Sequence, residues 1–147
     1  MRTVVRLEEK NLAEFVDIVA TSFTAKELFT DANKRTYLQQ LQWEMADPTV
    51  GFYGLYEDGH LLGGMKFYDF QMKLLSTTTL AGGVGLVATS LTNKKQGVCK
   101  DMITFFLEHY RKKGAPIALL HAFRPDFYRK MGFGFGVKNN QYRVKSE

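Results

Sequence analysis

The chain has 147 residues with a formal net charge of +5, and 45% of its residues are hydrophobic. This length and composition predict one globular domain over residues 1–147 and exclude a disordered chain. No apolar run is long enough to span a bilayer, and the N-terminus lacks the apolar core of a signal peptide, so we expect a cytoplasmic protein without a membrane partner. The single cysteine, Cys99, excludes an internal disulfide, and three scattered histidines have no metal-ligand spacing, so no metal is expected.

The first third of the chain predicts one strand and two helices. Residues 3–7 alternate like a strand, and Asn11 with Glu14 resembles a capping box at the start of a helix. A second helix is expected from Asp31 to shortly before Pro48, because the residue that precedes a proline disfavours helical geometry.

The middle of the chain predicts three strands. Asp58-Gly59 tolerates the positive φ angles of a tight turn and therefore predicts a hairpin. Farther along, Gly82, Gly83 and Gly85 indicate a bend or a bulge. The first two strands are expected at residues 52–57 and 60–68, and strand character continues after them at residues 72–75 and 79–90.

The last third predicts a helix from Val98 to the region of Gly114, then a strand at residues 117–120. A short helix over residues 124–131 and a strand region over residues 133–144 are expected to follow. The resulting order of elements predicts an α/β fold with a mixed, largely antiparallel central sheet flanked by helices.

A short basic loop from Lys94 to Gly97 connects the strand that ends near Ser90 with the helix that begins at Val98. The first N–H groups of a helix have no partner inside the helix and carry a partial positive charge, so the adjacent lysines make this point attractive to an anion. A phosphate is the expected ligand, and a solvated basic helix start is the alternative. The loop follows the carboxyl end of a strand, which is where open α/β sheets bind ligands.

Two motifs and the order of elements extend this interpretation. Residues 94–99 read KKQGVC and residues 127–133 read FYRKMGF. Together they resemble the GNAT superfamily of acetyl-CoA-dependent N-acetyltransferases over nearly the whole chain. The first motif is similar to the family's Arg/Gln-x-x-Gly-x-Gly/Ala loop, with Lys94 and Cys99 as departures, and the second is similar to its FYxKxGF signature.

The resemblance implies acetyl-CoA as cosubstrate and transfer of the acetyl group to a primary amine by direct attack. Backbone amides of the loop and the helix start would hold the coenzyme pyrophosphate, and the strand before the loop would pair with the pantetheine arm where the sheet splays open. A strand amide near Thr89 would stabilise the oxyanion that forms during attack on the thioester. The implied coenzyme-binding residues are Val87, Ala88, Thr89, Lys94, Lys95, Gln96, Gly97, Val98, Cys99 and Lys100.

Tyr128 is the candidate general acid, because a phenol stays protonated at neutral pH and can donate a proton to the departing thiolate. The alternative is a core tyrosine with a satisfied hydroxyl. Cys99 lies near a helix N-terminus, where a thiol pKa can fall, but the family frame favours a packing role over a nucleophile.

One histidine and two carboxylates are further candidates for the acceptor side of the site. His121 ends a strand and is expected to face the site, either as a base or acceptor contact or as a structural histidine. His60 and His109 are expected to be exposed and without a role. Asp126 or Glu44 would attract a cationic acceptor.

More narrowly, residues 81–102 and FYRKMGFGFG resemble the N-terminal domain of the enhanced-intracellular-survival (Eis) type of acetyltransferase. Proteins of that type join this domain to a second acetyltransferase-like domain and a C-terminal domain of sterol-carrier type, so this chain would be a fragment or a shortened relative. The resemblance implies aminoglycosides, polyamines or lysine side chains as acceptors. A catalytically silent CoA-binding domain is the alternative function.

The positive net charge also allows a nucleic-acid partner. We expect none, because the aromatic residues occupy core positions and no RNA-binding signature is present. Self-association into a homo-oligomer stays open.

Overall fold

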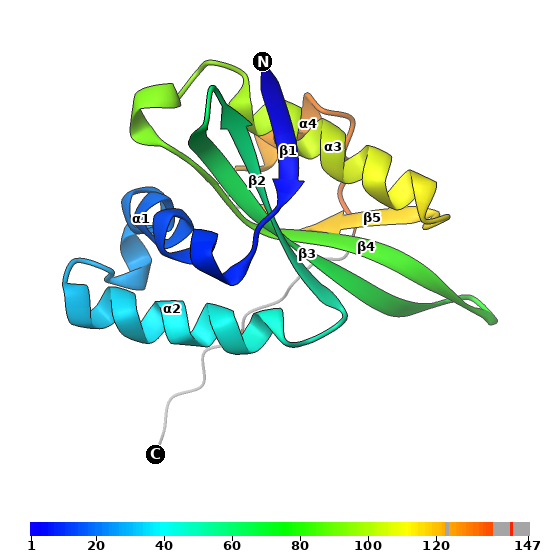
Figure 1. The fold of residues 1–147 in the computed structure, drawn as a ribbon. Coiled ribbons are helices and arrows are strands. Elements are labelled where there is room, and N and C mark those ends of the chain that lie inside the picture. Colours follow the sequence, from blue (N-terminus) through cyan, green and yellow to red (C-terminus); the bar gives the residue numbers. More distant parts are fainter. Residues whose placement is uncertain (123, 137–141, 143–147) are drawn as a thin grey trace.

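The computed structural model describes residues 1–122, 124–136 and 142. In this part of the chain one five-stranded sheet has the order β1-β2-β3-β4-β5, with antiparallel pairing throughout except for the parallel pair β4–β5 (Figure 1). The strands are β1 (Arg2–Arg6), β2 (Val50–Glu57), β3 (His60–Leu74), β4 (Thr77–Thr89) and β5 (Ile117–Leu120). The expected mixed, largely antiparallel sheet is confirmed.

Helices cover both faces of the sheet, α1 and α2 on one side and α3 on the other (Figure 1). The helices are α1 (Leu12–Ser22), α2 (Asp31–Met45), α3 (Val98–Lys112) and α4 (Pro125–Arg129). Short 3-10 turns lie at Glu9–Asn11, Thr24–Lys26 and Leu91–Asn93. Among the described residues no helix combines the length and the apolar composition needed to cross a membrane.

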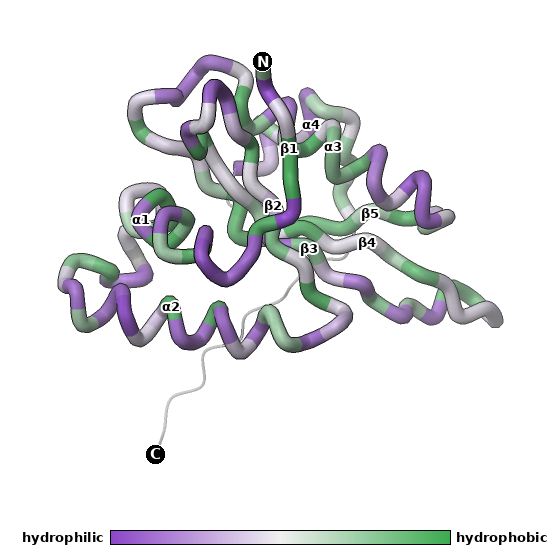
Figure 2. The backbone as a smooth tube through the Cα atoms, viewed as in Figure 1, coloured by the Kyte–Doolittle hydropathy of each residue, from purple (hydrophilic) through white to green (hydrophobic). Residues whose placement is uncertain are grey.

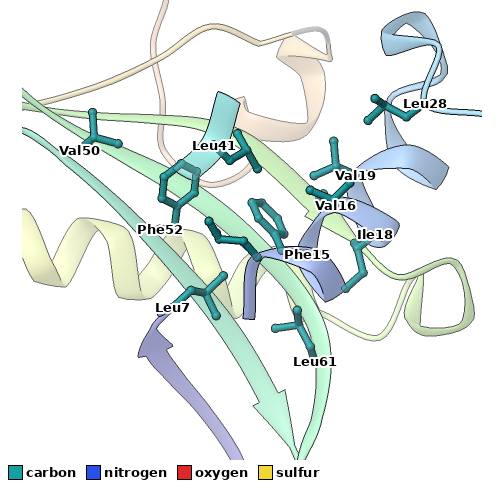
Figure 3. Close-up of a cluster of buried hydrophobic side chains, with 12 residues drawn as sticks. Leu7, Phe15, Val16, Ile18, Val19, Leu28, Leu41, Val50, Phe52 and Leu61 are labelled. Atoms are coloured by element: carbon teal, nitrogen blue, oxygen red, sulfur yellow. The ribbon is translucent and has the colours of Figure 1, made fainter. Parts of the chain in front are cut away.

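Each side of the sheet has its own hydrophobic core. Between the sheet and α1 and α2, Phe15 and Phe52 are at most 1% exposed and meet edge to face, surrounded by aliphatic side chains (Figure 3). Beneath α3, Phe106 and Met65 are completely buried. Burying one such side chain contributes about 1.5–3 kcal/mol, so these two cores hold the helices against the sheet.

The start of α1 differs from the sequence-based expectation. Asn11 does not form a box with Glu14; instead its side-chain oxygen accepts a hydrogen bond from the backbone N–H of Glu8 at 3.1 Å. A 3-10 turn at Glu9–Asn11 therefore precedes the helix. The predicted capping box at Asn11 and Glu14 is wrong because the extra turn moves the first free N–H groups toward the N-terminus.

Two strand predictions also need correction. The segments expected at residues 60–68 and 72–75 are one continuous strand, β3. Of the strand expected at residues 133–144, residues 133–136 have no regular secondary structure. The remaining residues of that prediction, except Tyr142, lie outside the described part of the chain.

The predicted bulge is real and lies near the end of β4. The β3–β4 register passes from Lys66 opposite Gly85 to Gly64 opposite Ala88, so β4 has one extra residue. Leu86 takes a φ of +50° within this step. A non-glycine residue with positive φ is uncommon, and bulges of this kind re-aim a strand beside functional sites.

The glycines of β4 have a different role from the expected bend. A Cβ on Gly82 would lie 2.2 Å from the ring of Tyr110, and a Cβ on Gly83 would lie 2.3 Å from the ring of Phe70. These glycines make room for aromatic rings on opposite faces of the sheet, and the bend itself occurs at Leu86.

Candidate functional site

A cavity of about 630 Å³ lies where β4, the loop at residues 94–97, the first turn of α3 and helix α4 meet. Hydrophilic residues (purple) are prominent on the loop between β4 and α3 (Figure 2). The cavity is lined by these residues of the predicted site: Val87, Thr89, Lys94, Lys95, Gly97, Val98, Cys99, Lys100 and Tyr128. Ala88 and Gln96 do not line it. Nine residues from separate segments therefore share one cavity.

One wall of the cavity is an open strand edge. Strand β5 pairs with β4 only over Ala81–Val84, so β4 continues to Thr89 without a β5 partner. Such an unpaired edge can accept an extended ligand as an added strand.

The backbone orientation at this edge follows from the ladder. Ser90 N–H donates to the Leu62 carbonyl at 2.8 Å, which makes Thr89 part of a non-hydrogen-bonded pair with β3. The Thr89 N–H and C=O therefore point away from β3, and the carbonyl accepts a hydrogen bond from Ser22 Oγ at 3.1 Å. Ala88, only 1% exposed, belongs to the core instead.

The loop before α3 has a backbone that suits anion binding. Gly97 is the N-cap of α3 with a φ of +80°, and Lys95 also has a positive φ, +66°. Gln96 does not face the cavity, because its side-chain amide donates to the Thr92 carbonyl at 3.3 Å. The N–H groups that open an α-helix lack intrahelical acceptors, so the first turn of α3 presents free donors at the cavity wall.

Tyr128, on α4, also lines the cavity and is 7% exposed. Phe127 and Phe133 pack edge to face against its ring. Burial, with a smaller contribution from Cys99, raises the pKa of Tyr128 to about 12. The hydroxyl is therefore protonated at neutral pH and can donate a proton to a group in the cavity.

Cys99 lines the same cavity, but burial raises the pKa of its thiol to about 11. Loss of solvent around the sulfur disfavours the charged thiolate, so this thiol is not activated as a nucleophile. The thiol stays protonated near neutral pH, which agrees with a packing role.

The histidines divide into three environments. His121 is exposed and does not line the cavity, contrary to the expectation that it faces the site. His60 is exposed as expected. His109 is half-buried, with its ring 5.2 Å from that of Phe67, and burial followed by the nearby Lys113 lowers its pKa. The prediction of an exposed His109 is wrong.

The two carboxylates proposed to attract a cationic acceptor lie in different places. Asp126 lines the cavity and accepts a hydrogen bond from Arg124 Nη2 at 2.8 Å, which lowers the pKa of the carboxyl group. Glu44 accepts a hydrogen bond from the buried Lys66 Nζ at 2.7 Å and does not line the cavity. Glu44 is therefore a structural ion-pair partner between α2 and β3.

Several cavity residues had no signal in the sequence. Ser22 and Phe23 come from the end of α1, far from the motifs in the chain. Arg124 lies shortly before the second motif and Lys130 lies within it, and both add positive charge to that of the three loop and helix lysines. Asp126 is the one carboxylate among the described lining residues, so the lysine and arginine side chains outnumber it. The cavity is therefore positively charged and favours an anionic ligand.

Comparison with known proteins identifies the family of this domain. The sequence matches the acetyltransferase (GNAT) domain family over residues 3–136. The chain belongs to this family. An uncharacterised N-acetyltransferase from Streptomyces avermitilis is 26% identical over 85 residues, which is 57% of this chain and 21% of that protein. The chain thus matches about a fifth of the length of this relative.

Solved structures show the same fold at low sequence identity. A transcriptional regulator from Bacillus halodurans superposes with a TM-score of 0.82 at 16% identity, covering 98% of this chain and 100% of that one. A predicted acetyltransferase from Clostridium acetobutylicum, solved with acetyl-CoA, has a TM-score of 0.75 at 14% identity, covering 97% and 96%.

Proposed function

We propose that this domain transfers the acetyl group of acetyl-CoA to a primary amine by direct attack. The observation that carries the proposal is the meeting of three features in one cavity: an open edge of β4, the glycine-started helix α3 and the largely buried side chain of Tyr128. Each of these features suits a different part of an acyl-coenzyme. Membership of the GNAT family supports the same reaction class.

The residues of the cavity fit the coenzyme as follows. The backbone at Val87 and Thr89 would pair with the pantetheine arm, while the loop amides and the start of α3 would bind the pyrophosphate. The lysines would add screened attraction for the phosphates. Acetyl-CoA supplies the activated thioester, and Tyr128 would protonate the thiolate that leaves.

The acceptor class is the finer part of the proposal. The resemblance of residues 81–102 to the Eis type supports aminoglycosides, polyamines or lysine side chains, and Asp126 offers a carboxylate to a cationic amine. The same resemblance supports residues 1–147 as one acetyltransferase domain of an Eis-like protein, for which we propose a cytoplasmic location on the composition of the sequence.

Calorimetry with acetyl-CoA, followed by an assay of thiol release with a panel of amines, tests this function. We expect saturable binding to one site and thiol release that depends on the amine. Absence of acetyl-CoA binding would contradict the proposal.

A catalytically silent CoA-binding domain is the second candidate. It is favoured by the cavity wall, where the described lining residues include no histidine and the Asp126 carboxylate is engaged by Arg124. An ammonium group needs to lose a proton before it attacks, so a missing base would slow transfer. Raising the pH deprotonates the amine without help from the protein. Binding without any transfer, even at pH 10, would favour the silent domain.

A further inference from the structure

Arg2, on the first strand of the sheet, contacts the loop before α3 from behind. Its Nη1 donates to the Gln96 carbonyl at 2.8 Å and to Asp101 Oδ2 at 2.8 Å, while Nε donates to Glu57 Oε1 at 3.2 Å. Arg2 does not line the cavity, whereas Gly97 does. The guanidinium therefore contacts the loop at a point outside the cavity lining.

The bond to Gln96 determines the direction of an amide. The Gln96 carbonyl and the Gly97 N–H belong to one planar trans peptide unit, so they point in opposite directions. The Gln96 carbonyl is held by Arg2, which lies outside the cavity lining, so the Gly97 N–H takes the opposite direction at a residue that lines the cavity.

This peptide unit also needs support. Lys95 and Gly97 both have positive φ, and a non-glycine residue adopts that geometry only when surrounding contacts favour it. A flipped peptide would present the carbonyl oxygen to the cavity and would repel a phosphate. The contact with Arg2 stabilises the orientation that donates.

Arg2 also neutralises charge near the helix start. Asp101 lies in the first turn of α3, where a carboxylate is attracted to the same helix end that would bind a phosphate. Without a cation beside it, this carboxylate would repel a diphosphate in the cavity. The Arg2–Asp101 pair is partly exposed, so its effect is screened but acts at short range.

We infer that Arg2 is a positioning residue for the coenzyme pyrophosphate, acting through the Gln96–Gly97 peptide and through Asp101. This inference rests on the proposed use of acetyl-CoA. In the sheet order, β1 is the strand farthest from β4, whose edge forms a wall of the cavity. The inference gives β1 a role in binding the diphosphate of the coenzyme.

The test compares Arg2→Met with the matched control Arg6→Met, which removes the same charge from an exposed position at the other end of β1. We expect the Kd for acetyl-CoA to rise about tenfold in Arg2→Met, the loss typical of a charge-assisted hydrogen bond, and to stay unchanged in the control. At saturating acetyl-CoA, kcat should be unchanged. Acetyl-pantetheine, which lacks the pyrophosphate, should react equally well with the parent and with Arg2→Met.

A second variant separates the two parts of the inference. Adding Asp101→Asn to Arg2→Met should recover part of the lost affinity, because the unpaired carboxylate is removed. Asp101→Asn alone retains the Arg2–Gln96 bond and should bind acetyl-CoA at least as tightly as the parent. This single variant tests the charge argument even if Arg2→Met does not fold.

The outcomes are distinguishable. A parent protein that does not bind acetyl-CoA overturns the proposed function and this inference with it. A parent that binds, together with an Arg2→Met variant of equal affinity, overturns the inference alone. Equal losses for acetyl-CoA and acetyl-pantetheine would identify Arg2 as a general structural residue, and weaker binding by Asp101→Asn would overturn the charge argument.

Discussion

Tyr128 combines burial with access to the cavity, which is the arrangement a proton donor requires. Replacing it with phenylalanine keeps the ring and its contacts with Phe127 and Phe133 but removes the hydroxyl. We expect kcat to fall roughly ten- to a thousandfold with little change in the Kd for acetyl-CoA. Steady-state kinetics and calorimetry measure the two quantities. Tyr53→Phe, outside the cavity lining, is the control, and an equal loss of binding in Tyr128→Phe would indicate a structural role.

The pH dependence of kcat/KM for the acceptor follows from the protonation of Tyr128 and of the amine. Burial raises the pKa of Tyr128 to about 12, so the acid form persists across the range in which an amine with a pKa of about 10 loses its proton. We therefore expect kcat/KM for the acceptor to rise about tenfold per pH unit from pH 7 to 9, as the free amine becomes available. A plateau that begins near pH 7 would instead indicate a base on the protein.

Gly97 is required by its backbone geometry. Its φ of +80° disfavours any residue with a Cβ by about 1–2 kcal/mol, so valine would move the amides at the start of α3. We expect Gly97→Val to abolish acetyl-CoA binding in calorimetry while the fold persists. Gly114→Val is a matched control, because Gly114 has a φ of +76° at the far end of α3. Unchanged affinity in Gly97→Val would remove the loop from the coenzyme site.

At the scale of elements, α3 approaches β4 closely because Gly82 has no side chain. A Cβ there would lie 2.2 Å from the Tyr110 ring, which is itself only 2% exposed and hydrogen-bonded through its hydroxyl to Asp69. We expect Gly82→Ala to lower the free energy of unfolding by about 1–3 kcal/mol through overpacking. Urea denaturation measures this value. Gly134→Ala, at a position with open space, should have little effect, and equal stability of the two variants would contradict the close packing.

At the scale of the molecule, the cavity joins the end of α1, the edge of β4, the start of α3 and α4. A ligand that contacts all of these elements binds only the folded state and should stabilise the whole domain. At a free acetyl-CoA concentration of 100 times Kd we expect about 2.7 kcal/mol of stabilisation, which corresponds to a rise in Tm of roughly 5–10 °C. Differential scanning calorimetry tests this, and Gly97→Val should show no such rise.

Local signals in the sequence were sufficient for most elements. Pro48 restricts the residue before it, Asp58-Gly59 favours a two-residue turn, and Gly97 allows a left-handed helix start, because each effect depends on one or two residues. The basic loop before α3 was found in the same way, whereas the motif around Tyr128 was identified by its resemblance to the family signature. The order of elements then limited the fold to a mixed sheet with helices on its faces.

Only the tertiary structure decided which distant residues meet. The burial of His109, the pairing of Glu44 with Lys66, and the approach of Ser22 to Thr89 each join segments that no periodicity relates. The same holds for Arg2 behind the loop at Gln96, 94 positions away in the chain. Local propensity acts over a few residues, whereas these contacts depend on how the two cores dock the helices on the sheet, so they are properties of packing and not of any single stretch of sequence.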